Sequence, residues 1–186
     1  MGTPIAASKG FTRTSARPRW AWLLPATATA IILVIGVRVE AFRIRMRPED
    51  VPFASVALLK QSGVAGNLAV EFSWGEYVIW HLGPRVKVSM DGRRETIYTP
   101  EVYKQNLDFM FGRADWSALL TRQPTDMALV TRGAADYNLL SLHPEWAQVF
   151  ADAGTALFVR RTSAVAEPLR VAAAGFVPPQ PPKQFP

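Results

Sequence analysis

The sequence predicts an α/β fold, a small sheet with flanking helices and a terminal β-hairpin, preceded by one transmembrane helix. Two observations support this prediction. Residues 20–37 form an apolar run without a charged side chain. From residue 52 onward, short apolar runs alternate with helical patterns until two strand-like runs close the folded part.

The apolar run reads WAWLLPATATAIILVIGV, and a helix of this length spans about 27 Å at about 1.5 Å per residue. That length is close to the hydrocarbon thickness of a bilayer, so we expect the helix to lie in membrane lipids. The aromatic and basic residues on its flanks are typical of a membrane interface. The expected membrane-interface residues are Trp20, Trp22, Arg38, Arg43, Arg45 and Arg47.

Two alternatives to a transmembrane helix remain open. A secretory signal peptide has a shorter apolar core of about 7–15 residues, followed by a small-residue cleavage site. Here Ala26, Ala28 and Ala30 lie inside the apolar run, before its most hydrophobic part. A buried core helix of this apolarity is expected to be nearer 10–14 residues long. An uncleaved membrane helix is therefore the preferred interpretation.

The charges on the two flanks barely decide the orientation. Lys9, Arg13, Arg17 and Arg19 precede the run, and the same number of arginines follows it up to residue 47. The amino terminus adds one positive charge, and positive segments stay on the cytoplasmic side. We therefore expect the N-terminus in the cytoplasm and the bulk of the chain on the other side.

The chain divides by composition into five expected segments. These are a basic flexible arm (1–19), the transmembrane helix (20–37), a juxtamembrane connector (38–49), an α/β domain (50–161) and a proline-rich tail (162–186).

Composition also narrows the classes of partner and cofactor. The chain has a net charge of +6, but residues 48–159 hold nine Lys/Arg against thirteen Asp/Glu. Because the positive charge lies outside the domain, it favours anionic lipids over nucleic acid as the partner. The absence of cysteine excludes disulfides, thiol catalysis and cysteine-bound metal, and two histidines do not favour another metal site. We expect no cofactor.

Glycine and proline residues mark the ends of the expected helices and strands in the first half of the domain. Trp74-Gly75 is interpreted as a break between a strand and a helix, Gly83-Pro84 as the end of that helix, and Asp91-Gly92 as a turn. We therefore expect, in order, a helix over 52–59, a strand over 68–70, a helix over 76–82 and a strand over 85–90.

The second half of the domain begins with the residue pattern that most strongly predicts a helix. Thr99 suits the N-cap, Pro100 the first turn and Glu101 the helix dipole. The expected apolar face of this helix, which ends before Gly112, consists of Val102, Tyr103, Leu107, Met110 and Phe111. We then expect a helix over 115–122, a buried strand over 127–130, a helix over 134–142 and a hairpin of strands 146–150 and 155–159.

An ordered set of short motifs covers about residues 66–161. It comprises WGEYVIW (74–80), PRVKV (84–88), MDGR (90–93), DMAL (126–129) and WAQVFAD (146–152), followed by Ala156, Phe158 and Arg160. This set resembles the extracytoplasmic C-terminal domain of bacterial polytopic membrane proteins related to C-type glycosyltransferases. The resemblance implies an α/β domain on the periplasmic side of a bacterial inner membrane.

The chain departs from this family in two respects. Glu76 stands where the family has the second of two glycines, and the many-helix bundle with its presumed catalytic carboxylate is missing. The resemblance therefore implies that the enzymatic part is absent or is supplied by another chain.

The most site-like cluster is Asp91-Gly92-Arg93-Arg94-Glu95. A carboxylate with two guanidinium groups at the end of a strand could bind a phosphate or a sugar acid. The other interpretation is a turn in which Asp91 bonds the local backbone and Arg93 pairs with an acid, and this one is favoured.

Three aromatic residues on the helix over 76–82 and just before it are a second candidate. Together with His81, the residues Trp74, Tyr77 and Trp80 could form an aromatic platform for a sugar. Their spacing also places them near one helix face, where packing into the core is the more common role. Core packing is the favoured interpretation.

The sequence does not predict an enzyme. The motifs of serine hydrolases, P-loop proteins, dinucleotide-binding proteins and zinc proteases do not occur. Pairing of His81 with Glu76, or of His143 with Asp136 or Glu145, is the remaining acid–base possibility.

We expect a non-catalytic, single-pass accessory subunit whose domain contacts other subunits of a membrane complex, such as a photosynthetic or respiratory assembly. The alternative is an envelope glycan or lipid-glycan factor.

Overall fold

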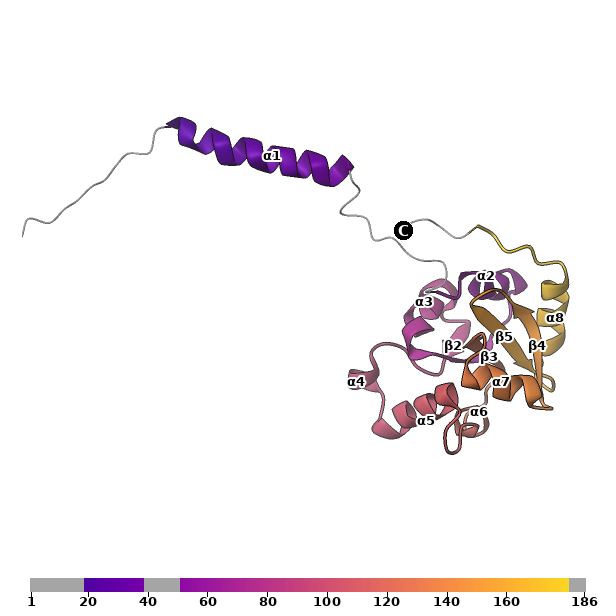
Figure 1. Ribbon diagram of the computed structural model, residues 1–186. Helices are drawn as coiled ribbons and strands as arrows, with labels where there is room; N and C mark the ends of the chain where they lie inside the picture. The colour runs from indigo at the N-terminus through magenta and orange to yellow at the C-terminus, as the bar shows by residue number, and fades with distance from the viewer. Residues whose placement is uncertain (1–18, 39–50, 181–186) are drawn as a thin grey trace, which may run out of the picture. The chain divides into compact units, whose positions relative to one another are not determined.

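A computed structural model describes residues 19–38 and 51–180 of the chain (Figure 1). The chain separates into two compact units, Met1–Ile44 and Arg45–Pro186. The expectations for the N-terminal arm, the connector and the interface residues Arg43, Arg45 and Arg47 lie outside the described residues.

The described part of the first unit, residues 19–38, is helical, as predicted. A 3₁₀ turn, η1 (Arg19–Trp22), continues into α1 (Leu23–Arg38). The hydroxyls of Thr27 and Thr29 donate to backbone carbonyls one turn earlier, at 2.9 and 2.8 Å, so the helix satisfies these polar groups itself. Its large apolar side chains are exposed on all sides; they are Leu23, Leu24, Ile31, Ile32, Leu33, Val34 and Ile35.

The transmembrane assignment of residues 20–37 does not gain support from this geometry. The α-helical part is 16 residues long. Within residues 19–38 and 51–180, no helix combines the length and the apolar character that crossing a bilayer demands.

The second unit is an α/β domain built on a five-stranded mixed sheet, which confirms the predicted fold class and the terminal hairpin. The strands are β1 (Gly66–Val70), β2 (Val86–Val88), β3 (Met127–Thr131), β4 (Trp146–Ala151) and β5 (Thr155–Arg160), in the order β2-β1-β3-β5-β4. β1 pairs in parallel with β2 and β3, and β5 pairs antiparallel with β3 and β4.

Helices cover both faces of the sheet (Figure 1). Leu68, Val70 and Leu129 face a core formed with α2 (Phe53–Ser62), α3 (Phe72–Leu82) and α8 (Ala166–Ala174). Ala69, Ala128 and Val130 face the opposite core, formed with α5 (Pro100–Phe111), α6 (Ala118–Thr121) and α7 (Ala135–Leu142). β3 contributes to both cores, as its continuous apolar run predicts.

The predicted break at Trp74-Gly75 is wrong, because both residues lie inside α3. The helix already begins at Phe72, directly after Glu71. Gly75 is buried where α3 crosses the backbone of Met90 and Asp91. A glycine there serves the close approach of two segments and does not interrupt the helix.

The cap of α5 is confirmed, but its predicted apolar face is right only in part, since Met110 packs against the core while the two fully buried positions lie elsewhere. Thr99 Oγ1 accepts a hydrogen bond from Val102 N at 3.4 Å, and Gly112 ends the helix in the left-handed conformation. The fully buried side chains are Asn106 and Phe109, whereas Phe111 is half exposed. The helix therefore presents a polar side chain to the protein interior.

The segment predicted as a tail belongs partly to the domain. α8 lies within it, with Leu169 fully buried, and the ring of Phe176 lies 5.5 Å from that of Phe150. The predicted boundary at residue 161 is thus too early, because an apolar side chain on α8 completes the core. A short helix, α4 (Arg94–Ile97), is a further element that the sequence does not predict.

Candidate functional site

The carboxylate of Asp91 is the buried centre of the predicted DGR cluster. Its Oδ1 accepts hydrogen bonds from Arg93 N at 2.9 Å and Arg93 Nε at 3.1 Å. Its Oδ2 accepts from Arg93 Nη2 at 2.7 Å and from the hydroxyl of Tyr98 at 3.2 Å. The hydrogen bond from Arg93 is the main reason that the pKa of Asp91 lies below its ordinary value.

These contacts match the turn interpretation of the cluster. The Arg93 side chain is 61% exposed, but its guanidinium folds back onto Asp91 two residues earlier. Arg94 starts α4, and its side chain lies outside what the structure describes. Among the described side chains, the positive charge that an anion would need is that of Arg93. It is already paired with Asp91 within the turn.

Asp91→Asn tests whether the cluster is structural. A buried carboxylate that accepts several charge-assisted hydrogen bonds is replaced by a neutral amide that cannot satisfy the same donors. We expect the free energy of unfolding at neutral pH to fall by about 2 kcal/mol, measured by urea unfolding followed by tryptophan fluorescence. Asp115→Asn, at an exposed ion pair with Arg122, is the matched control. Equal stability of D91N and D115N would argue against the structural role.

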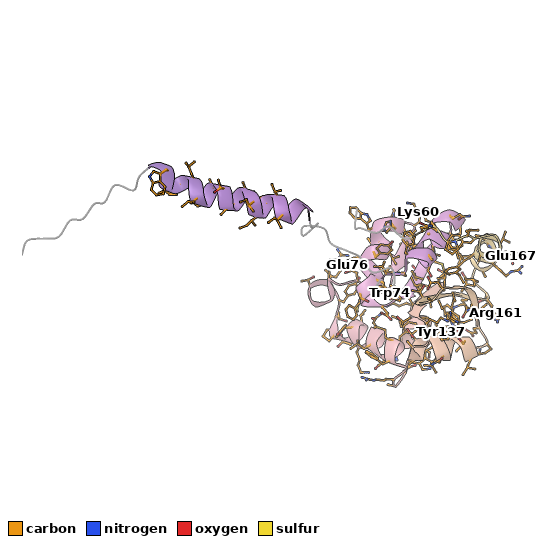
Figure 2. All side chains as sticks on the ribbon, turned by 45° about the horizontal axis from the view of Figure 1, so that its top comes forward. Lys60, Trp74, Glu76, Tyr137, Arg161 and Glu167 are labelled. Atoms are coloured by element: carbon orange, nitrogen blue, oxygen red, sulfur yellow. The ribbon has the colours of Figure 1, made fainter. Side chains whose placement is uncertain are left out.

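The predicted aromatic platform does not form. Trp74 is buried in the core, while the ring of Tyr77 is half-buried against the ring of His81, with centroids 4.5 Å apart. Trp80 is 80% exposed. The three rings therefore do not converge on one pocket, and only Trp74 fully follows the core interpretation. Figure 2 shows Trp74 within the domain.

The predicted acid–base pairs are not assembled around His143. Its Nδ1 accepts a hydrogen bond from the backbone N of Glu145 at 3.3 Å, whereas the Glu145 carboxylate pairs with Arg160 at 2.6 Å. Asp136 lies at the other end of α7, about 10 Å away along the helix axis. Glu76, the expected partner of His81, lies instead against Gly92.

A partly buried polar cluster, which the sequence does not predict, lies at the carboxyl ends of β1 and β3. Glu71 follows β1, and its Oε1 accepts a hydrogen bond from the hydroxyl of Thr131, the last residue of β3, at 2.6 Å. Asn106 of α5 donates to the carbonyl of Val70 at 3.1 Å. The chain leaves β1 toward β2 and leaves β3 toward β4 and β5, on opposite sides. Such a switch point is where α/β sheets commonly bind ligands.

Asp136 adds a buried acid to this end of the sheet. It lies at the start of α7 with no exposed surface, and its Oδ1 accepts a hydrogen bond from Tyr137 N at 2.9 Å. Burial, together with the charge of Glu71, raises its pKa to about 7. In the part of the chain that the structure describes, Asp136 Oδ2 and Asn106 Oδ1 have no hydrogen-bond partner. The cluster is thus equipped to hold a proton near neutral pH.

One sequence signal could have indicated part of this cluster. Glu71 and Thr131 are polar residues at the ends of apolar strand-like runs, where a parallel sheet collects functional groups. Asn106 and Asp136 carry no such signal, because they lie on helices. No group of three or more His, Asp or Glu side chains that could hold a metal ion occurs in residues 19–38 and 51–180.

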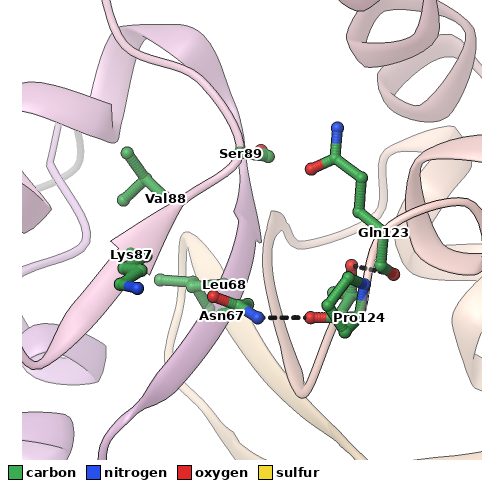
Figure 3. A pocket seen from close by; sticks show the side chains of 8 residues that line it. Asn67, Leu68, Lys87, Val88, Ser89, Gln123 and Pro124 are labelled. Carbon is green, nitrogen blue, oxygen red and sulfur yellow. Dashed lines mark hydrogen bonds between the residues drawn. The ribbon is translucent and has the colours of Figure 1, made fainter.

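A small cavity lies beside β1, the edge strand β2 and the segment before β3 (Figure 3). Its volume is about 230 Å³, and it is lined by Asn67, Leu68, Lys87, Val88, Ser89, Gln123, Pro124 and Thr125. The Asn67 amide donates to the carbonyl of Pro124 at 2.6 Å and fixes one wall (Figure 3). None of the site residues predicted from the sequence lines this cavity.

Comparison of the chain with protein-family models, with curated proteins and with solved structures finds no match. The resemblance to the extracytoplasmic domain of C-type glycosyltransferase relatives therefore stays a prediction.

Proposed function

We propose that the chain is a non-catalytic accessory subunit that is held in a membrane by its N-terminal helix. The observation that supports this proposal is the distribution of apolar side chains on α1, where residues such as Ile32 and Leu24 are each 67% exposed. A helix that is apolar on every face is stable only when lipid or other helices cover it. The internally bonded hydroxyls of Thr27 and Thr29 suit such surroundings.

The α/β domain is the part that contacts other subunits in this proposal, on the extracytoplasmic side that the flanking charges favour. Large apolar side chains on its surface support a binding role. Phe111, Val171 and Val177 are each at least 50% exposed. Apolar residues at such positions are common at protein and membrane contacts.

The alternative function, an envelope glycan or lipid-glycan factor, has less support. It needs Trp74, Trp80 and Arg93 to face one open pocket. Trp74 is buried, Trp80 is exposed, and Arg93 is bonded to Asp91.

Fractionation of the full chain, followed by purification in a mild detergent, tests the proposal. We expect the chain in the membrane fraction after a high-salt wash, and in fixed stoichiometry with other membrane proteins. Ile32→Lys combined with Val34→Lys should move it to the soluble fraction, because charges in lipid are costly. Leu142→Lys, on the domain surface, should leave fractionation unchanged. A soluble wild-type chain would refute the membrane role, and a chain that purifies alone would refute the accessory role.

A further inference from the structure

The C-terminal end of α3 carries an exposed aromatic side chain, and basic residues lie at the same end of the helix. Trp80 is 80% exposed, and its neighbour Ile79 is 38% exposed. With His81, Lys60 and Arg85, these residues form what we call the Trp80 surface. It is distinct from the polar cluster at Glu71 and Asp136, and the proposed function does not yet use it.

Two cations from different elements meet at this surface. Burial lowers the pKa of the His81 imidazole, and the nearby charge of Lys60, in the last turn of α2, lowers it further. Arg85 reaches the end of α2, where its Nη1 would lie 3.8 Å from a Cβ at Gly63. Neither Lys60 nor Arg85 forms an ion pair with another described residue. Their positive charges are therefore directed to solvent.

The nearest acid on α3 does not neutralise this surface. Glu76 lies one helical turn before Trp80, and its carboxylate points to Gly92, where it would overlap a Cβ. It interacts there with the charge of Arg93. The end of α3 thus combines exposed apolar area with unneutralised positive charge.

This combination fits the headgroup region of an anionic bilayer. An indole buries its ring among the upper acyl chains and keeps its N–H hydrated, while Lys and Arg side chains reach the phosphates. Each cation near an anionic surface strengthens binding by about fivefold. We propose that the Trp80 surface rests on the anionic headgroups of the membrane that holds α1. This inference depends on the membrane role proposed above.

The absence of cysteine makes a direct test possible, since any introduced cysteine is unique. Gln61→Cys places an environment-sensitive fluorophore (NBD) beside Lys60 without removing a residue of the Trp80 surface. Ile32→Cys reports on α1, and Leu142→Cys, at an exposed position on α7, is the control on the domain. Each labelled full-length chain is reconstituted into vesicles of phosphatidylcholine alone, or of phosphatidylcholine with phosphatidylglycerol.

We expect the label at residue 61 to shift to the blue in the anionic vesicles only, while the label at residue 142 stays in water. Trp80→Ala should abolish the shift at residue 61, and Lys60→Gln with Arg85→Gln should lower the docked-to-free ratio about 25-fold. Arg122→Gln, an exposed arginine on another element, should not change it.

Several outcomes would overturn the inference. These are a label at residue 61 that stays in water, that shifts equally without anionic lipid, that shifts together with the label at residue 142, or that is unaffected by Trp80→Ala. If the label at residue 32 is in lipid during such an outcome, the membrane role of α1 stands and only the inference fails. If the label at residue 32 is in water, both fail.

Discussion

Gly75→Ala should destabilise the domain by more than about 3 kcal/mol. A Cβ at this position would lie 2.2 Å from the carbonyl oxygen of Met90 and 2.6 Å from the Cα of Asp91. Both are backbone atoms, so a rotamer change cannot relieve the overlap. The helix α3 would have to move away from the strand end that it covers, which would loosen the core around Trp74 and Val78.

Gly175→Ala is the matched control for this substitution. Gly175 follows α8, has φ near −110°, and a Cβ there would meet no atom within 4 Å. We expect its free energy of unfolding to stay within about 0.5 kcal/mol of the wild-type value. Urea unfolding of the two variants, followed by tryptophan fluorescence, gives the comparison. Equal stabilities would mean that α3 does not pack as closely as described.

Gly75 also shows the limit of a prediction that uses only local sequence patterns. Local patterns predicted the strand ending at Val70, the cap at Thr99 and the hairpin of β4 and β5, because each depends on neighbouring residues. The local pattern predicts a break at Gly75, since the contact of this residue with Asp91 is not visible in a local pattern. The same reason explains why α8 was missed.

The candidate site also contains local contacts, which the sequence predicts, and long-range contacts, which it does not predict. The turn at Asp91 was predictable, because Arg93 bonds to a carboxylate only two residues away. The contact between Glu71 and Thr131 joins residues 60 positions apart. It exists because β1 and β3 pair in parallel, with Val70 opposite Leu129. Strand order depends on how whole helices pack, so a single sequence does not reveal this cluster.

Two of the motifs that suggest a family resemblance, WGEYVIW (74–80) and MDGR (90–93), lie together in space. Gly75 from the first motif packs against Asp91 from the third, and Glu76 lies against Gly92. Such residues form the interface between α3 and the end of β2, so the motifs have a packing role. A resemblance that rests on them bears on the fold, and it carries little information about chemistry at a site.

The stability of the domain should fall as the pH rises from about 4 to 7, because of Asp136. Its pKa is raised from 3.8 to about 7 by burial and by Glu71. At low pH the carboxyl is protonated in both the folded and the unfolded chain, so it has no differential effect. Above pH 3.8 the unfolded chain releases the proton, whereas the folded chain retains it. The contribution to the free energy of unfolding therefore decreases by about 4 kcal/mol up to pH 7.

Asp136→Asn isolates this effect, because the amide has nearly the same shape and does not titrate. We expect D136N to gain stability relative to the wild type as the pH rises, whatever constant offset the amide itself causes. Glu71→Gln should reduce the pH dependence, since it removes the charge that helps to raise the pKa of Asp136. Urea unfolding between pH 4 and 8 measures all three chains, with Asp115→Asn as the exposed control.

Parallel stability curves for the wild type and D136N would contradict a protonated Asp136 and would mean that the carboxylate is solvated or paired in the folded chain. A slope that disappears in D136N and weakens in E71Q has a different meaning. It shows that the charge of Glu71 acts on the buried Asp136 at the ends of β1 and β3. The domain would then retain, at a free-energy cost near neutral pH, a buried acid that packing alone does not require.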